Sequence, residues 1–166
     1  MGAFRMTDME LIVWRHADAG DAALGVASDL ERRLTDRGRK QAERMARWLQ
    51  ARRPERYAVL SSPAARARET AEALGVKVRT DARLAPDAEV AHALAALNWP
   101  DGPESRSRHV VLVGHQPMLG RLVSLLLSGQ EADWSVRKGA IWWLSTRERE
   151  GRDQVVLRAA IAPDLA

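Results

Sequence analysis

Short apolar runs and longer amphipathic segments alternate along this chain. The runs at Glu10–Trp14, Ala58–Ser61 and Val110–Gly114 have the length and composition of strands buried on both faces of a sheet. Apolar residues at helical spacing predict helices over four further segments, Thr35–Arg52, Pro63–Gly75, Glu89–Leu97 and Pro117–Ser128. This alternation is typical of βαβ units around a parallel sheet.

Residues at the ends of these helices agree with the assignment. Thr35 is a suitable N-cap, and Pro63 and Pro117 suit first helical positions. Gly75 and Gly129 suit helix ends, because glycine adopts the left-handed conformation there without strain.

The remaining segments predict the edges of the sheet. Val76–Thr80 indicates a weak edge strand, and Asn98–Ser107 indicates an exposed loop. We expect Ala140–Ser145 and Val155–Ile161 to pair as an antiparallel extension across a polar turn at Arg147–Asp153. The expected fold class is α/β, a three-layer α/β/α sandwich with a mostly parallel central sheet and one antiparallel edge strand.

Length and composition restrict the class of protein. A chain of 166 residues with 46% hydrophobic composition predicts one domain over residues 1–166, with Met1–Asp8 as an extension that has no function. The absence of cysteine, of a signal-peptide core and of a membrane-length apolar run favours the cytoplasm. A net charge of +4 does not indicate nucleic-acid binding. We therefore expect a monomer with neither nucleic acid nor membrane as a partner.

Two histidines follow predicted strands. His16 comes after Arg15 at the end of the first run, and His115 comes after Gly114 at the end of the third. Because ligands bind at the carboxyl ends of parallel strands, we expect both imidazoles to share one site. Two simpler interpretations stay open, a buried core histidine for His16 and a helix cap for His115, since an Arg-His pair alone is a weak motif.

Arginines accompany the two histidines. Arg66 lies in the first turn of a predicted helix, where a cation is unfavourable unless an anion binds nearby. Arg32 precedes the helix that starts after Thr35 and can reach the same edge, whereas we interpret Arg68 as a surface residue. Arginine matches phosphate oxygens with its planar fork, and a neutral imidazole is a nucleophile. The set therefore indicates phosphoryl chemistry.

These residues fall in four ordered motifs, Arg15-His16-Ala17, Arg32-x-Leu34-Thr35-x-x-Gly38, Ser62-Pro63-x-x-Arg66-Ala67-x-x-Thr70 and Gly114-His115-x-Pro117. In this order and at these spacings, the chain resembles the histidine phosphatase superfamily, which is phosphoglycerate mutase-like in fold, and most closely its SixA-type phosphohistidine phosphatases. The resemblance implies that His16 is the nucleophile that becomes phosphorylated and that Arg15, Arg66 and His115 hold the phosphoryl oxygens. It also implies that Arg32 joins them, that backbone groups near Gly139 and Ala140 close the pocket, and that neither a cofactor nor a metal is needed.

Two positions depart from the superfamily pattern. Ala17 replaces the usual glycine, a change that SixA-type members share. Arg83 stands where phosphomonoesterases of the superfamily carry an acidic proton donor. An imidazole leaves phosphorus more easily than an alkoxide does, so the missing acid favours a phosphohistidine substrate. Three carboxylates remain candidates for an acid or base, Asp18 before the others, then Asp87 and Glu89.

Three functions remain open at this point. The leading one is a phosphatase acting on a phosphorylated histidine-containing phosphotransfer protein through a phosphohistidine enzyme intermediate. The second is a small-molecule phosphomonoesterase of the same superfamily. The third is a non-catalytic phosphate-binding or nucleic-acid-associated module, favoured by excess arginine and by Trp134, Trp142 and Trp143. Trp142 and Trp143 are expected instead to pack on the two faces of a late strand.

Overall fold

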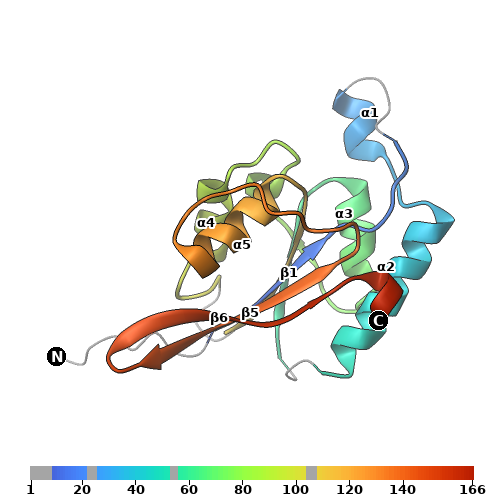
Figure 1. Ribbon diagram of the computed structural model, residues 1–166. Helices are drawn as coiled ribbons and strands as arrows, with labels where there is room; N and C mark the ends of the chain where they lie inside the picture. Colours follow the sequence, from blue (N-terminus) through green and yellow to red (C-terminus); the bar gives the residue numbers. More distant parts are fainter. Residues whose placement is uncertain (1–8, 22–25, 53–55, 104–107) are drawn as a thin grey trace.

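The computed structural model describes residues 9–21, 26–52, 56–103 and 108–166, and its strands form one six-stranded sheet (Figure 1). The strands lie in the order β3 (Arg79–Thr80), β2 (Ala58–Ser61), β4 (His109–Gly114), β1 (Glu10–Arg15), β5 (Ile141–Arg149) and β6 (Arg152–Ile161). The first four are parallel, β5 is antiparallel to β1, and β6 is antiparallel to β5. The prediction of a mostly parallel sheet is confirmed. The one strand that runs opposite to the others is β5, which lies next to the edge strand β6 rather than at the edge as predicted.

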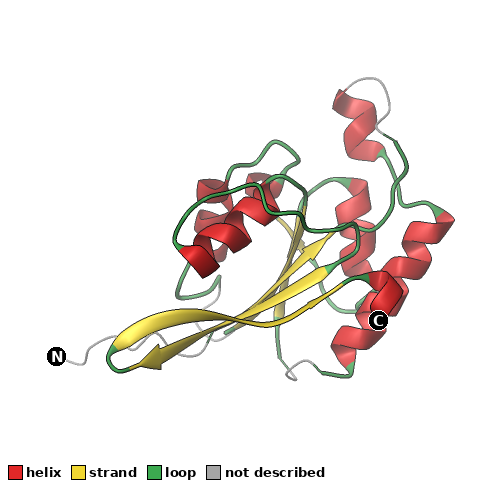
Figure 2. Ribbon diagram, in the orientation of Figure 1, coloured by secondary structure: helices red, strands yellow, loops and turns green. Residues whose placement is uncertain are grey.

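Helices cover both faces of this sheet. They are α1 (Val26–Glu31), α2 (Asp36–Gln50), α3 (Ala65–Glu72), α4 (Val90–Leu97) and α5 (Met118–Ser128), with short 3-10 helices η1 (Ala82–Leu84) and η2 (Pro163–Leu165). Figure 2 shows the sheet between α2 and α3 on one side and α4 and α5 on the other, which confirms the three-layer sandwich. No helix in the described ranges is long and apolar enough to cross a membrane.

The central strands β1 and β4 are almost entirely apolar because each contributes to two cores. In β1, Leu11 and Val13 belong to the cluster packed by α4 and α5, whereas Ile12 and Trp14 belong to the cluster packed by α2 and α3. Trp142 and Trp143 of β5 divide in the same way, as expected for two faces of one strand. Burial on both faces leaves the strand ends as the place where polar side chains meet solvent.

The predicted antiparallel pairing of the last two strands is confirmed, but the turn predicted at Arg147–Asp153 is too long. Strands β5 and β6 continue pairing to Arg149 and Arg152, so the turn is only Glu150 and Gly151, both with positive φ. Positive φ at both central residues is the geometry of a tight hairpin turn. The polar residues there belong to the strands because the hairpin projects beyond the helices, where its side chains are exposed (Figure 1).

Other boundaries also differ from the prediction. Helix α3 begins at Ala65 rather than Pro63, and Pro117 is the N-cap of α5 rather than its first residue. The strand predicted at Val76–Thr80 shortens to Arg79–Thr80, because only these two residues pair with β2. Helices α1 and η1 were not predicted, since each is too short to show an apolar stripe. Met1–Asp8 and part of the predicted loop Asn98–Ser107 lie outside the described residues.

Candidate active site

His16 directly follows β1, and backbone hydrogen bonds fix its position. Its N–H donates to the oxygen of Gly114 at 3.1 Å, and its own oxygen accepts from the N–H of Gly139 at 3.0 Å. The ring nitrogen Nδ1 lies 2.8 Å from the oxygen of Ala17. A carbonyl oxygen only accepts, so Nδ1 carries the proton and Nε2 carries the lone pair. Burial, reinforced by the positive charge of Arg66, lowers the pKa of His16 to about 4. The neutral ring at pH 7 therefore presents a nucleophilic Nε2.

His115 directly follows β4, the parallel neighbour of β1. The ring centroids of His16 and His115 are 5.1 Å apart, so the two predicted strand-end histidines do share one site. His115 is 3% exposed, and its Nε2 lies 2.7 Å from the Oγ of Ser62. Burial and then the charges on His16 and Arg66 lower the pKa of His115 to about 3. Both imidazoles are therefore uncharged at neutral pH.

Arg15 and Arg66 approach the histidines from β1 and α3. Arg15 donates from Nη1 to the oxygen of Val136 at 2.8 Å. Arg66, only 4% exposed, donates from Nη1 to the backbone oxygen of Asp29 at 2.7 Å and from Nη2 to its Oδ2 at 3.1 Å. Burial lowers the pKa of both arginines, but a guanidinium starts so high that it stays charged at neutral pH. They are the fixed positive charges of the site.

Asp29, to which the sequence assigned no role, holds two of the arginines. Its Oδ1 lies 3.0 Å from Nη2 of Arg32, which also donates from Nη1 to the oxygen of Gly20 at 2.8 Å. Burial opposes ionisation of Asp29, but hydrogen bonds and charge from Arg32 and Arg66 lower its pKa overall. The spacing of Asp29 and Arg32 along one helical turn was a signal for this pair. Arg32 thus reaches the site edge as expected, with most of its donors already bonded to the protein.

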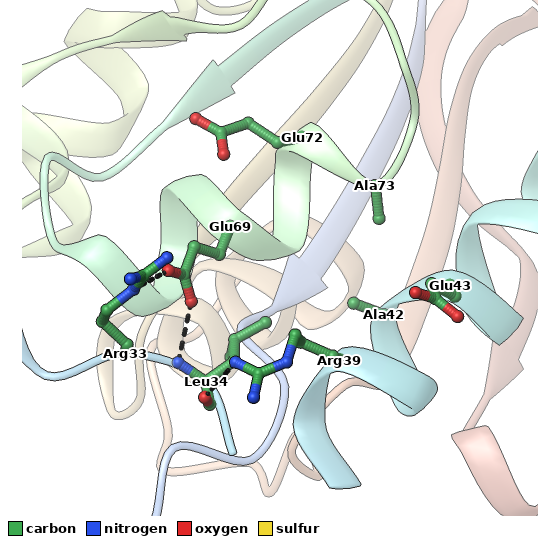
Figure 3. Close-up of a pocket in the computed structure, with 8 residues that line it drawn as sticks. All are labelled: Arg33, Leu34, Arg39, Ala42, Glu43, Glu69, Glu72 and Ala73. Atoms are coloured by element: carbon green, nitrogen blue, oxygen red, sulfur yellow. Dashed lines mark hydrogen bonds and ion pairs between the residues drawn. The ribbon is translucent and has the colours of Figure 1, made fainter. Parts of the chain in front are cut away.

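Arg33 and Leu34, which follow Arg32, line a pocket together with Glu69 of α3 (Figure 3). The contacts there show how this segment is anchored. Glu69 of α3 points toward the segment, where its Oε2 accepts from the N–H of Leu34 at 2.9 Å and its Oε1 accepts from Arg33. These contacts tie the chain after α1 to the same helix that carries Arg66. The contacts of Glu69 therefore hold the segment that follows Arg32 in place.

Three buried nitrogen atoms of the site find no hydrogen-bond partner among the described residues. They are Nε of Arg15, Nε of Arg66 and Nδ1 of His115. Buried polar atoms in folded proteins nearly always have partners, so unpartnered ones require an explanation. All three belong to residues gathered around His16, and a tetrahedral oxyanion there would supply several acceptors. The arrangement therefore suits a phosphoryl group next to Nε2 of His16.

Gly139 and Ala140 lie beside His16 but use their N–H groups within the protein. Gly139, at a φ of 74°, donates to the oxygens of Arg15 and His16, and Ala140 donates to the oxygen of Arg137. These residues position the backbone of the nucleophile. Their N–H groups are bonded to the protein, and closure of the pocket by this backbone stays a prediction.

Asp18 is close to the site, but its surroundings oppose a role as an acid. Its Oδ2 accepts from the hydroxyl of Thr35 at 2.7 Å, and Lys138 lies 3.3 Å from its Oδ1. The Thr35 hydrogen bond is the main reason that the pKa of Asp18 lies below its ordinary value. A general acid must hold a proton near neutral pH, which requires a shift in the opposite direction.

The other carboxylates are not better placed. Arg83, in the position of the missing acid, is held by Asp81 through Nη2 and Oδ2 at 2.7 Å, and this contact lowers the pKa of Asp81. Asp87 and Glu89 are exposed residues that precede α4. Within the described ranges, no hydrogen bond or ion pair joins either of them to the histidines or arginines of the site.

Comparison with known proteins agrees with this geometry. The model of the histidine phosphatase superfamily (branch 1) matches residues 11–89. The phosphohistidine phosphatase SixA of Escherichia coli is 34% identical over 130 residues, which cover 74% of this chain and 76% of that protein. The chain belongs to the histidine phosphatase superfamily.

Solved structures of phosphatases share the fold over nearly the whole chain. A structure of the protein histidine phosphatase SixA complexed with tungstate superposes with a TM-score of 0.69 at 30% identity, covering 94% of this chain and 98% of that one. A mycobacterial glucosyl-3-phosphoglycerate phosphatase complexed with inorganic phosphate has a TM-score of 0.67 at 22% identity, covering 95% and 100%, and shows the fold alone. The family model and the SixA relatives support phosphatase activity for this histidine phosphatase.

Proposed function

We propose that this histidine phosphatase removes phosphate from phosphohistidine on a protein, through a phosphorylated His16. The observation that carries the proposal is the hydrogen bond from Nδ1 of His16 to the oxygen of Ala17, which leaves Nε2 as the nucleophile. Around it lie three buried nitrogen atoms without partners among the described residues, and the nearby carboxyls of Asp18 and Asp29 both have lowered pKa values.

In the first step, the lone pair on Nε2 of His16 attacks phosphorus in line with the leaving nitrogen. The bond between phosphorus and the substrate imidazole breaks, and its electron pair stays on the departing nitrogen. Arg15, Arg66 and His115 stabilise the charge on the equatorial oxygens. Phosphoryl transfer depends mainly on such positioning and charge stabilisation, which these buried groups supply without a metal.

In the second step, water attacks the phosphorus of phospho-His16. The bond between phosphorus and Nε2 breaks, its electron pair returns to the imidazole, and the proton lost by water leaves with the phosphate or the solvent. The same three side chains stabilise the oxygens, because the geometry at phosphorus is the same. His16 then regains its original state, with Nδ1 still bonded to Ala17.

The nature of the leaving group favours phosphohistidine over a phosphate ester. An alkoxide needs a proton from an enzyme acid as it leaves, whereas a phosphorylated imidazole protonated on its second nitrogen leaves as a neutral ring. Asp18 and Asp81 both have lowered pKa values, so neither is suited to donate that proton. The site thus matches a substrate that needs no acid.

A basic pocket next to the nucleophile supports a protein as the carrier of that phosphohistidine. The pocket has a volume of about 600 Å³ and shares Arg15 with the phosphoryl site. It is lined by four cationic side chains, Arg15, Arg37, Arg137 and Lys138, and by two carboxylates, Asp18 and Asp164. Its charge is therefore net positive, which attracts an acidic surface beside a phosphorylated histidine.

The test compares substrates and traps the intermediate. We expect a phosphorylated histidine phosphotransfer domain and free phosphohistidine to be hydrolysed with higher kcat/KM than sugar phosphates, at rates that EDTA does not change. Mass spectrometry after an alkaline quench is expected to find phosphate on His16. His92, exposed on α4, offers a matched control. His16→Ala is expected to abolish turnover, and His92→Ala to leave it unchanged.

Two outcomes contradict the proposal. Full turnover by His16→Ala removes the assigned nucleophile. Faster hydrolysis of sugar phosphates than of phosphohistidine assigns the chain instead to the small-molecule phosphomonoesterases.

A further inference from the structure

We propose that Ser62 is a positioning residue that fixes the tautomer of His115, so that the neutral ring donates a hydrogen bond from Nδ1 to the transferring phosphoryl group. This inference rests on the proposed function for its catalytic consequence. The tautomer itself is a property of the free protein and is measured without substrate.

Ser62 is held rigidly between two strands of the site. It directly follows β2, is fully buried, and its N–H donates to the oxygen of Val113 in β4 at 3.0 Å. Its Oγ accepts from the N–H of Ala64 at 3.2 Å and lies 2.7 Å from Nε2 of His115. The hydroxyl oxygen is therefore an acceptor on one side, and its other contact is with the ring of His115.

Counting protons along this chain of contacts decides the tautomer. If Nε2 of His115 carried the proton, the hydroxyl proton of Ser62 would have no acceptor among the described residues, inside a fully buried site. If Nε2 is unprotonated, the hydroxyl donates to it, and Nδ1 of His115 is then the one group of this chain without a partner, instead of both Nδ1 and the hydroxyl. A buried donor without an acceptor costs about 1–3 kcal/mol, so the second arrangement is favoured. His115 then carries its proton on Nδ1.

The tautomer determines whether His115 attracts or repels a phosphoryl oxygen. The pKa of His115 is about 3, mainly because the ring is buried, so the ring is neutral during turnover and helps only through an N–H. Nδ1 is the buried nitrogen without a protein partner. With a proton it donates to a phosphoryl oxygen, whereas without one its lone pair faces that oxygen. Ser62 thus converts a neutral imidazole into a directed donor.

Long-range proton–nitrogen correlation spectra of the ¹⁵N-labelled protein test the tautomer directly. We expect Nε2 of His115 to show the shift of an unprotonated nitrogen and Nδ1 that of a protonated one, with the signals assigned by comparison with His115→Gln. A wild-type His115 protonated on Nε2 overturns the inference. This result is independent of activity, so it stands apart from any failure to hydrolyse phosphohistidine.

A matched pair of variants tests the consequence for catalysis. Ser61 is equally buried, but its hydroxyl donates only to the backbone oxygen of Ser62 at 2.9 Å. With free phosphohistidine as the probe, we expect Ser62→Ala to lower kcat about 5- to 10-fold with little change in KM, the effect of losing one directed hydrogen bond. Its spectrum is expected to show both tautomers of His115, whereas Ser61→Ala keeps the wild-type spectrum and kcat.

An unchanged tautomer and kcat in Ser62→Ala overturn the inference. An equal loss of kcat in Ser61→Ala also overturns it, because the effect then reflects the packing of buried hydroxyls. Should Ser62→Ala not fold, the wild-type spectrum still decides the tautomer.

Discussion

Replacing Arg66 with alanine removes the most buried positive charge of the site. Its guanidinium makes two hydrogen bonds to Asp29 and leaves Nε buried without a partner. In our mechanism this nitrogen donates to an equatorial oxygen whose charge grows in the transition state. A pre-positioned donor of this kind is worth about 2–4 kcal/mol, so kcat/KM is expected to fall about 30- to 1,000-fold.

The same substitution has a smaller effect on stability. Asp29 keeps its bonds to Arg32, and its side chain is 26% exposed, so its charge stays partly compensated and solvated. We expect the free energy of unfolding to fall by about 1–3 kcal/mol, measured by urea titration. The fall in kcat/KM is therefore expected to be larger than the fall in the fraction of folded protein at the assay temperature.

Arg68→Ala is the matched control. Arg68 lies two positions further along α3 and is exposed, so its removal is expected to change the free energy of unfolding by less than about 0.5 kcal/mol and to leave kcat/KM unchanged. Steady-state rates on phosphohistidine, with folding checked by circular dichroism, compare the two variants. A folded Arg66→Ala protein within about three-fold of wild-type kcat/KM refutes the electrostatic role, because three-fold corresponds to less than 1 kcal/mol.

Three further predictions concern pH, packing and substrate docking. Because burial lowers the pKa of His16 to about 4 and of His115 to about 3, the unfolded chain binds protons first as pH falls. The free energy of unfolding, measured by urea titration, is thus expected to be highest above pH ~6.5 and to fall as the pH is lowered further. His16 alone accounts for a fall of about 3 kcal/mol by pH 4, so the pH profile of His16→Ala is expected to be flatter. Gly38→Ala places a Cβ 1.9 Å from the backbone oxygen of Asp18, so the free energy of unfolding is expected to fall by about 1–3 kcal/mol in the same urea titration. A fall of less than about 1 kcal/mol contradicts this contact. Arg37→Glu is expected to raise the KM for a phosphorylated phosphotransfer domain at low salt and to leave the KM for free phosphohistidine unchanged. Equal changes in KM for both substrates argue against docking in the basic pocket.

The parts of the fold that the sequence predicted depend on local patterns. The apolar runs of β1 and β4 indicated strands buried on both faces, and the structure places Ile12 and Val13 in different cores. Thr35 indicated the start of α2, and its hydroxyl accepts from the N–H of Gly38 at 3.0 Å. The turn between β5 and β6 was predicted too long, because the polar residues that flank it belong to the exposed strands of the projecting hairpin.

The positions of the two site histidines follow from the sequence, whereas the contacts of Asp29 and Ser62 follow only from the tertiary structure. The sequence by itself placed His16 and His115 after neighbouring buried strands, because continuous apolar runs and parallel order bring such ends together. Only the tertiary structure joined Asp29 to Arg66, 37 residues apart, and Ser62 to His115, 53 residues apart. These contacts depend on distances of a few ångströms between separate elements, and no local pattern encodes them. The physical reason is that strand burial is a property of a segment, whereas the charge and proton positions of the site are properties of the packed chain.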